Sequence, residues 1–302
     1  MHGGNRLVEC TVKRKFWIIN VKNCIKKILK SCPVCIRYKQ QNKQQLMGIL
    51  PEYRVKVAFP FYHCGVDYAG PASMKFSNGR EQKSFKGYIA VFICMTTRAI
   101  HLEAVSGLTT DAFMAALKRF FARRGKSGHI YSDNGTNFVG AAGAMEKEFA
   151  RVIKQNANLA EVLEHQLVKW HFIPPGSPHF GGLWEAAVKS MKFHLKRVIG
   201  ENKMTFEEMS TLLAQIEAIL NSRPMCDISN GDESLDVLTP VHFLIGRPMI
   251  DAPEFVNDAA IGCLERWKLV QKMRKHFWNN WTNDYLTNLH LRYKWKTASQ
   301  NL

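Results

Sequence analysis

Two short stretches decide the fold of this chain, GVDYAGP at residues 65–71 and YSDNGTNF at residues 131–138. Each joins strand-forming sequence to turn residues, Gly-Pro in the first and Asp-Asn-Gly in the second. We therefore expect strands over 62–68 and 128–132, with Asp67 and Asp133 where these strands run out into turns. On local sequence alone, a plain turn residue is the more common interpretation of each Asp.

The pattern on either side of these stretches alternates strands and helices. Strands are expected over 86–95, 99–105 and 168–173, and helices over 109–123, 138–166 (broken near 156–158), 183–199 and 264–289. Thr205 and Glu208 predict a capping box for a further helix, 205–221. A Pro- and Gly-rich loop spans 174–182. The order predicts an α/β fold, a mixed sheet with helices packed on it.

Composition excludes several classes of protein. The longest apolar run, Ile89–Met95, is far too short to cross a membrane, and no apolar signal stretch follows residues 1–4. We therefore expect a protein that is neither membrane-bound nor secreted, with reduced cysteines. The net charge is +17, and all of the excess lies at the ends: 13 Lys/Arg against 2 Asp/Glu in residues 1–56, and 8 against 2 in residues 264–302. Segregated positive charge favours a polyanionic partner such as nucleic acid.

A third acid, Glu185, opens the helix after the glycine loop. An acid at a helix start is also favoured by the helix dipole alone. Two strand-end carboxylates and one helix-start carboxylate can nevertheless converge at one sheet edge. Their hard oxygens suit two Mg²⁺ or Mn²⁺ ions that assist in-line phosphoryl transfer. Lys189, Lys192 and Lys196 follow on the same helical stripe, either as a solvated face or as contacts to a DNA backbone.

Several motifs together resemble the integrase of long-terminal-repeat retrotransposons, and their residues are similar to those of the BEL/Pao group. Besides the two opening stretches, they are PHFGGLWEAAVK (178–189), WHFIPP (170–175), LNSRP (220–224), LTPVHFLIGRP (238–248) and RWKLV (266–270). The likeness covers nearly the whole chain. It implies a ribonuclease-H-like core that trims element 3′ DNA ends and joins them to target DNA by metal-dependent transesterification.

The resemblance also assigns roles to residues. It implies a catalytic and metal-binding triad of Asp67, Asp133 and Glu185. It implies DNA contacts by Lys189, Lys192, Lys196, Asn134 and His179, and an active-site loop that contains Gly181 and Gly182. The interval of 52 residues between Asp133 and Glu185 is longer than in retroviral integrases. We interpret the additional stretch, about 141–166, as an insertion typical of this group.

The resemblance further implies a zinc-binding N-terminal domain, with His2, Cys32 and Cys35 as ligands. The first histidine of the family pattern would lie before Met1, which predicts an incomplete zinc site on an N-terminally truncated domain. The expected organisation is a zinc-binding helical domain (1–45), a linker (46–56), the catalytic core (57–225), an irregular extension (226–263) and a basic helical tail (264–302). The family's C-terminal barrel is expected to be absent.

Three functions remain open at this stage. The first is an active integrase, an enzyme that works on double-stranded DNA as a homo-oligomer. This chemistry predicts a nuclear location, with a cytoplasmic nucleoprotein particle as a second place. The next is a catalytically silent DNA-binding remnant or co-opted fragment of such an element. The last is a ribonuclease H, for which Glu103 is the candidate extra acid.

Overall fold

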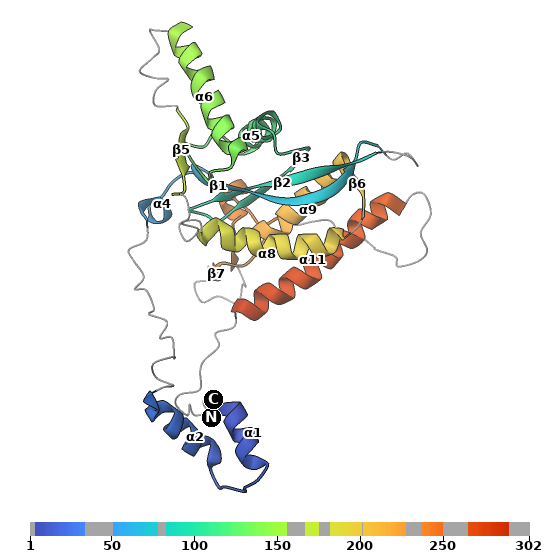
Figure 1. Ribbon diagram of the computed structural model, residues 1–302. Helices are drawn as coiled ribbons and strands as arrows, with labels where there is room; N and C mark the ends of the chain where they lie inside the picture. Colours follow the sequence, from blue (N-terminus) through green and yellow to red (C-terminus); the bar gives the residue numbers. More distant parts are fainter. Residues whose placement is uncertain are drawn as a thin grey trace. The chain divides into compact units, whose positions relative to one another are not determined.

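The computed structural model of this protein describes residues 4–33, 51–77, 83–155, 167–174, 182–200, 202–227, 237–249 and 265–289 (Figure 1). The chain forms two compact units, residues 1–50 and 51–302, and each is described by itself. Among the described residues, no helix combines the length and the apolar character that a membrane span requires.

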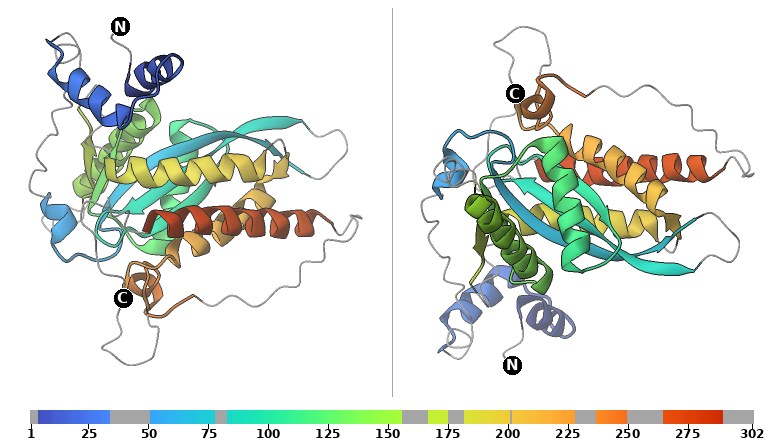
Figure 2. Two further views of the ribbon diagram at one scale, coloured as in Figure 1. Left: turned by 90° about the horizontal axis from the view of Figure 1, so that it is seen from below. Right: turned by 90° about the horizontal axis from the view of Figure 1, so that it is seen from above.

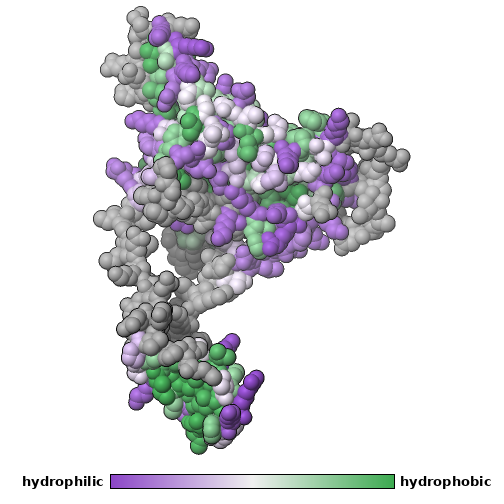
Figure 3. All heavy atoms as spheres, in the orientation of Figure 1, coloured by the Kyte–Doolittle hydropathy of each residue, from purple (hydrophilic) through white to green (hydrophobic). Residues whose placement is uncertain are grey.

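The N-terminal unit contains two short helices, α1 (Asn5–Lys13) and α2 (Val21–Ser31), within the segment expected to be helical. Helix α2 buries Val21 and Ile25 and leaves its lysines exposed. Between the helices, Trp17 is 94% and Ile19 is 87% exposed. Figure 3 shows apolar surface on this unit.

A mixed sheet forms the centre of the larger unit (Figure 1). Its strands are β1 (His63–Lys75), β2 (Ser84–Cys94), β3 (Ile100–Val105), β4 (His129–Ser132), β5 (Lys169–Phe172) and β6 (Met204–Thr205). The order is β3-β2-β1-β4-β5, and β6 pairs with the end of β1. Strands β1, β2 and β3 are antiparallel, whereas β4 and β5 run parallel to β1. The mixed sheet predicted from the sequence is confirmed, and its order is that of a ribonuclease-H-like fold.

Helices cover both faces of the sheet (Figure 2). They are α5 (Thr110–Arg124) and α6 (Thr136–Gln155) on one side, and α8 (Gly182–Ile199), α9 (Phe206–Asn221) and α11 (Glu265–Leu289) on the other. Phe92, Phe113 and Phe120 form the centre of the first core. Met191 and Phe277 belong to the second core, where the tail helix packs with α8 and α9. The tail predicted from spacing therefore belongs to the same unit as the sheet.

Local capping signals explain where two of these helices begin. The Thr109 side chain accepts a hydrogen bond from Ala112 N at 3.2 Å at the start of α5. Thr205 and Glu208 form the predicted capping box of α9, with bonds of 3.1 and 2.8 Å. Both starts are set by residues within one helical turn, which is why the sequence could place them.

The expected end of the first strand at Gly70-Pro71 is wrong. Strand β1 continues to Lys75, and its register with β2 shifts between Ala69 and Ala72. This bulge takes Pro71, which has no N–H to donate, out of the ladder. Gly70 has φ 134°, and a Cβ there would lie 3.0 Å from the Tyr88 ring. The turn-like dipeptide is therefore a bulge inside a long strand.

Helix α9 closes the edge of the sheet at β3. Asn221 donates to the carbonyl of Ile100 and accepts from its N–H, both at 2.8 Å, and Glu217 accepts from Leu102 N at 2.9 Å. These side chains, one helical turn apart, satisfy backbone groups that an edge strand otherwise leaves unpaired. Arg223 donates to the Arg98 carbonyl at 2.6 Å, and burial lowers the pKa of Arg223 to about 10. The LNSRP motif thus holds the β2–β3 connection.

Two predicted boundaries differ from the structure. The expected linker ends in a helical turn, α4 (Glu52–Val55), whose Tyr53 ring centroid lies 4.9 Å from that of the Tyr131 ring. The larger unit therefore already includes residues from Pro51 onward. The expected irregular extension contains regular pieces among its described residues. They are β7 (Cys226–Asp227), β8 (Val237–Leu238) and α10 (His242–Ile245). Strands of two residues and one-turn helices are too short to produce a periodic pattern.

Candidate active site

Asp67 lies on β1, and Asp133 lies one residue beyond the end of the adjacent parallel strand β4, at the same level of the sheet. The last pair between β1 and β4 is Gly65 with Tyr131, and each Asp follows two residues later. Because side chains alternate along a strand, Asp67 lies on the same face as Gly65. Neighbouring strands are about 4.8 Å apart, so the edge where β4 ends brings two carboxylates together.

Asp67 is half-buried in the middle of β1, and both of its oxygens have partners. Oδ1 accepts from Tyr68 N at 2.6 Å, and Oδ2 accepts from the Lys192 ammonium at 2.9 Å. The Asp67 and Lys192 side chains are 25% and 37% exposed. Opposite charges at this exposure contribute little stability, about 0–1 kcal/mol. The contact shows instead that a cation on α8 reaches this carboxylate.

Asp133 is exposed, and its Oδ1 accepts from Gly135 N at 3.0 Å in the turn before α6. The turn interpretation of this residue is therefore correct as far as it goes. The neighbouring Asn134 amide donates to the Ile173 carbonyl at 2.7 Å, which ties the turn to the end of β5. Ser132 accepts from the Trp170 indole at 2.8 Å. These bonds fix the segment that carries Asp133.

Helix α8 brings the third predicted acid into the same unit. Gly182 is its first residue and Glu185 its fourth, but the Glu185 side chain lies outside the described residues. The structure thus juxtaposes Asp67 and Asp133 and gives the backbone position of Glu185. Convergence of all three carboxylates stays a prediction.

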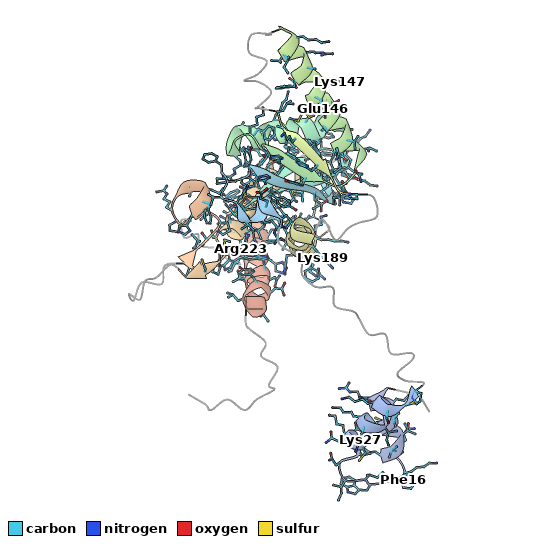
Figure 4. The ribbon with its side chains drawn as sticks, turned by 90° about the vertical axis from the view of Figure 1, so that its left-hand side faces the viewer. Phe16, Lys27, Glu146, Lys147, Lys189 and Arg223 are labelled. Atoms are coloured by element: carbon cyan, nitrogen blue, oxygen red, sulfur yellow. The ribbon has the colours of Figure 1, made fainter. Side chains whose placement is uncertain are left out.

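The three lysines of α8 differ in their contacts. Lys189 and Lys196 are exposed, and Figure 4 labels Lys189 on this helix. Lys192 instead forms the ion pair with Asp67. Arg197, near the end of the same helix, lies 3.3 Å over the Phe193 ring. The helix therefore carries a basic face beside the two acids.

The remaining predicted site residues lie largely outside the described part of the chain. His179 and Gly181 of the loop, and the zinc ligands His2 and Cys35, fall there. Cys32 follows the last residue of α2 and is half-buried. Within the described residues, no group of three or more His, Cys, Asp or Glu side chains is arranged to hold a metal ion. The Glu185 carboxylate and the His2 and Cys35 side chains lie outside the described residues.

The donor chemistry of the edge suits a hard divalent cation. Carboxylate oxygens are the ligands that Mg²⁺ and Mn²⁺ prefer, and two of them come from adjacent strands here. The ammonium of Lys192 on Asp67 shows that this edge attracts positive charge. Asp67, Asp133 and Glu185 are thus the residues that would hold such ions.

Glu103, the candidate fourth acid, does not lie beside Asp67 and Asp133. It pairs with Ala90 in the β2–β3 ladder, on the face covered by α5, and it is buried with Arg119 and His101. Asp67 pairs with Val91 and lies on the opposite face. A cavity of about 360 Å³ also lies beside Glu103, away from the acidic edge. The ribonuclease H hypothesis thereby loses its additional carboxylate.

Sequence reasoning missed two features of this region. It assigned Lys192 to DNA but did not foresee its ion pair with Asp67. It also passed over three histidines on the same face of the sheet, His63, His129 and His171, whose rings lie together. A single residue on each of three strands forms no local motif, so only their alternation with buried residues could have indicated a common face.

Two family models match parts of the chain. Residues 66–178 match the integrase core domain, and residues 265–302 match a family of unknown function (DUF5641). The match to the core domain includes Asp67 and Asp133 and extends through β5. No curated protein matches the chain.

Two solved structures resemble the chain at 15% sequence identity. One is the cryo-EM structure of the simian T-cell lymphotropic virus intasome in complex with PP2A regulatory subunit B56 gamma, with a TM-score of 0.40 over 86% of this chain and 77% of that one. The other is the crystal structure of the catalytic core domain of BIV integrase, with a TM-score of 0.35 over 62% and 95%. The family match indicates an integrase-type polynucleotidyl transferase core, a class that uses divalent metal ions.

Proposed function

We propose that this protein is the integrase of a long-terminal-repeat retrotransposon similar to the BEL/Pao group, and that Asp67, Asp133 and Glu185 are its catalytic residues. The observation that carries the proposal is the β1–β4 register, in which Asp67 and Asp133 each follow the last strand pair by two residues. The integrase core domain match over 66–178 supports the same assignment.

In the proposed reaction, the protein cleaves a phosphodiester by attack of water, which leaves a 3′ hydroxyl and a 5′ phosphate, and exchanges one phosphodiester for another when a DNA 3′ hydroxyl attacks. A water or DNA 3′ hydroxyl attacks phosphorus and loses its proton, the bond to the leaving 3′ oxygen breaks, and that oxygen gains a proton. Divalent cations bound by the three acids supply activation of the attacking oxygen and stabilisation of the leaving oxygen. No covalent protein nucleophile takes part, so the acids act as ligands throughout.

The residues around the acids position the substrate. Lys192 has a flexible stem and a mobile point charge, so it can exchange the Asp67 carboxylate for a phosphate oxygen of DNA. Lys189 and Lys196 extend the same basic face along α8. The bonds from Asn134 to Ile173 and from Trp170 to Ser132 keep the Asp133 turn rigid while DNA binds. Rigid support matters because small displacements at a reacting centre are costly.

The wider setting follows from this chemistry. The partners are double-stranded DNA ends and target DNA, bound by a homo-oligomer, and the place of action is the nucleus. The N-terminal unit is proposed to bind zinc through His2, Cys32 and Cys35. The positive ends of the chain supply electrostatic attraction to the DNA backbone.

The test is strand transfer on a branched DNA that mimics the integration product, in Mg²⁺ and in Mn²⁺. We expect wild-type activity, and a loss of about 10³-fold or more in Asp133→Asn, because several kcal/mol of transition-state stabilisation depend on that ligand. Asp111→Asn, an exposed acid in the first turn of α5, is the control and should retain activity.

Equal activity in Asp133→Asn and wild type would contradict the proposal. DNA binding without activity in wild type would favour the second candidate, a catalytically silent DNA-binding remnant. The observation behind that candidate is the placement of the whole positive excess in residues 1–56 and 264–302, outside the acidic site.

A further inference from the structure

Three imidazole rings lie together on three neighbouring strands, N-terminal to the two acids along β1 and β4. His63 begins β1, His129 begins β4, and His171 lies on β5. In the parallel register His63 pairs with His129, and His171 pairs with Tyr131 one step along the face. His63 and Asp67 are four residues apart on β1, as are His129 and Asp133 on β4, so cluster and acids share one face.

The rings of this cluster lie nearly parallel to one another along the sheet. The His63 and His129 ring centroids are 4.6 Å apart at 14°, and those of His129 and His171 are 5.2 Å apart at 23°. His129 Nδ1 lies 2.9 Å from His171 Nε2, and His63 Nδ1 lies 3.2 Å from the Tyr131 hydroxyl. These bonds engage one nitrogen of each ring, and within the part of the chain that the structure describes the other nitrogen has no hydrogen-bond partner. The parallel stack does not converge on a point as metal ligands do.

The surroundings keep the cluster open to solvent. His171 is exposed, and His63 and His129 are half-buried. Tyr62 packs edge-on against His63 and is 41% exposed. A Cβ at residue 128 would lie 2.5 Å from the Tyr62 ring, so the glycine there makes room for this tyrosine. The cluster is thus an accessible aromatic surface.

The electrostatic surroundings of the cluster are positive. Burial and the neighbouring rings His129 and His171 lower the pKa of His63. Burial and nearby Lys169 lower the pKa of His171, and burial, His171 and Lys169 lower that of His129. The other titratable groups facing the cluster are tyrosines, Tyr53 from α4, Tyr62 before β1 and Tyr131 on β4. Among the described residues, no carboxylate is hydrogen-bonded to these rings.

We propose that His63, His129 and His171, which we call the histidine face, bind a phosphate group of the DNA whose reactive phosphodiester lies at the Asp67–Asp133 edge. This inference rests on the proposed function, because it adds a second contact for the same DNA. Four residues of strand span about 13 Å, and B-DNA rises 3.4 Å per base pair. A duplex that follows the strands from the acidic edge reaches the histidine face within about four base pairs.

A phosphate at this surface reverses the balance that keeps the rings neutral. Without DNA, a proton on one imidazole is opposed by burial and by the adjacent rings and Lys169. With a phosphate present, the protonated ring donates a charge-assisted hydrogen bond from its unengaged nitrogen. Binding therefore takes up protons. For each proton taken up, the affinity for DNA rises up to tenfold for every unit by which the pH falls. A histidine face that only packs the sheet end would show no such linkage.

The experiment measures proton uptake when the full-length protein binds a short duplex DNA of random sequence. Calorimetric titrations at pH 6.5 in buffers of different ionisation enthalpy give the number of protons bound. Dissociation constants measured from pH 8 to pH 6 give the same quantity independently. The variants are the triple change His63→Gln, His129→Gln, His171→Gln and the single change His171→Gln. His276→Gln, an exposed histidine on α11, is the matched control.

We expect wild type and His276→Gln to take up protons and to bind more tightly as the pH falls. The triple variant should lose this dependence, and His171→Gln should lose part of it while keeping the circular dichroism of wild type. Equal proton uptake in wild type and His171→Gln, or none in wild type, would overturn the inference. If wild type takes up protons on binding DNA but shows no strand transfer, the proposed function alone would be overturned. If wild type does not bind DNA at any pH, both proposals would be overturned.

Discussion

Two pairs of carboxylates in this molecule differ in solvent exposure and in the number of their hydrogen-bond partners. The Asp67 side chain is 25% exposed within β1, and Asp133, just beyond the end of β4, is exposed and accepts a hydrogen bond from Gly135 N at 3.0 Å. Glu103 and Glu217 are 5% and 7% exposed beside edge strand β3. Each oxygen of the second pair accepts from a partner. Glu103 accepts from Arg119 Nε at 2.7 Å and Arg123 Nη1 at 3.0 Å, and Glu217 from Leu102 N and Arg124.

His101 joins the two buried carboxylates. Its Nε2 lies 3.1 Å from Glu103 Oε1, and its Nδ1 lies 2.9 Å from Glu217 Oε2. Carboxylate oxygens facing both ring nitrogens favour the protonated imidazole, which has two N–H donors. Arg124 Nε also lies 3.4 Å from Nδ1, and its charge opposes this protonation. The buried network is therefore closed, with its acceptors occupied, and its role is to join β3, α5 and α9.

The two pairs differ in the way that a cation-binding site differs from a structural ion-pair network. A buried acid whose acceptors are all occupied within the chain has little capacity left for a ligand, and its removal leaves other buried charges uncompensated. An exposed acid with acceptor positions left over can bind a cation, and its removal leaves the fold intact. We therefore expect substitutions in the two pairs to have opposite effects on stability and activity.

The largest effect on stability is expected from Glu217→Ala. The change removes the carboxylate that faces His101 Nδ1 and Arg124 and that accepts from Leu102 N, so the free energy of unfolding should fall by about 3–5 kcal/mol. Urea denaturation followed by circular dichroism measures this loss. Glu207→Ala, an exposed acid on the same helix, should change the free energy of unfolding by less than about 0.5 kcal/mol.

The comparison would fail if Glu217→Ala and Glu207→Ala had the same stability. It would also fail if Asp133→Asn, which we expect to abolish strand transfer, destabilised the fold as much as Glu217→Ala does.

A smaller change in the free energy of unfolding is expected from a change in pH. Burial opposes protonation of His101, but its hydrogen bonds to Glu103 and Glu217 outweigh this, so the pKa of His101 is raised. A raised folded pKa gives stability that is present below the unfolded pKa of about 6.5 and lost as the pH rises through the folded value. Urea denaturation at successive pH values above 6.5 should show this decline in wild type. His101→Gln should flatten it, and an unchanged decline would remove His101 as its cause.

Local signals in the sequence sufficed for several elements. The capping box of Thr205 and Glu208 needs only neighbours within one turn, and the burial of Phe277 and Trp281 follows from helical spacing. Asp67 and Asp133 could be singled out because each stands in a distinctive short motif. The β1–β4 register that aligns them could not be predicted, because pairing between strands 66 residues apart is set by the whole sheet.

Contacts between distant segments account for what was missed. Glu217 and Asn221 look like ordinary helix residues until β3 is placed beside them. Gly70-Pro71 reads as a strand end, because nothing local shows that β2 continues to pair beyond the bulge. The histidine face depends on three strands whose order the sequence did not give.

The most direct test of the central claim is the effect of Mn²⁺ on the melting temperature of wild type, Asp133→Asn and Asp111→Asn. A ligand that binds only the folded state stabilises it, by about 2.7 kcal/mol at one hundred times the dissociation constant. We expect a Mn²⁺-dependent rise in melting temperature for wild type and Asp111→Asn, and a much smaller rise for Asp133→Asn. The same rise in all three proteins would contradict the assignment of the Asp67–Asp133 edge as the divalent-cation site.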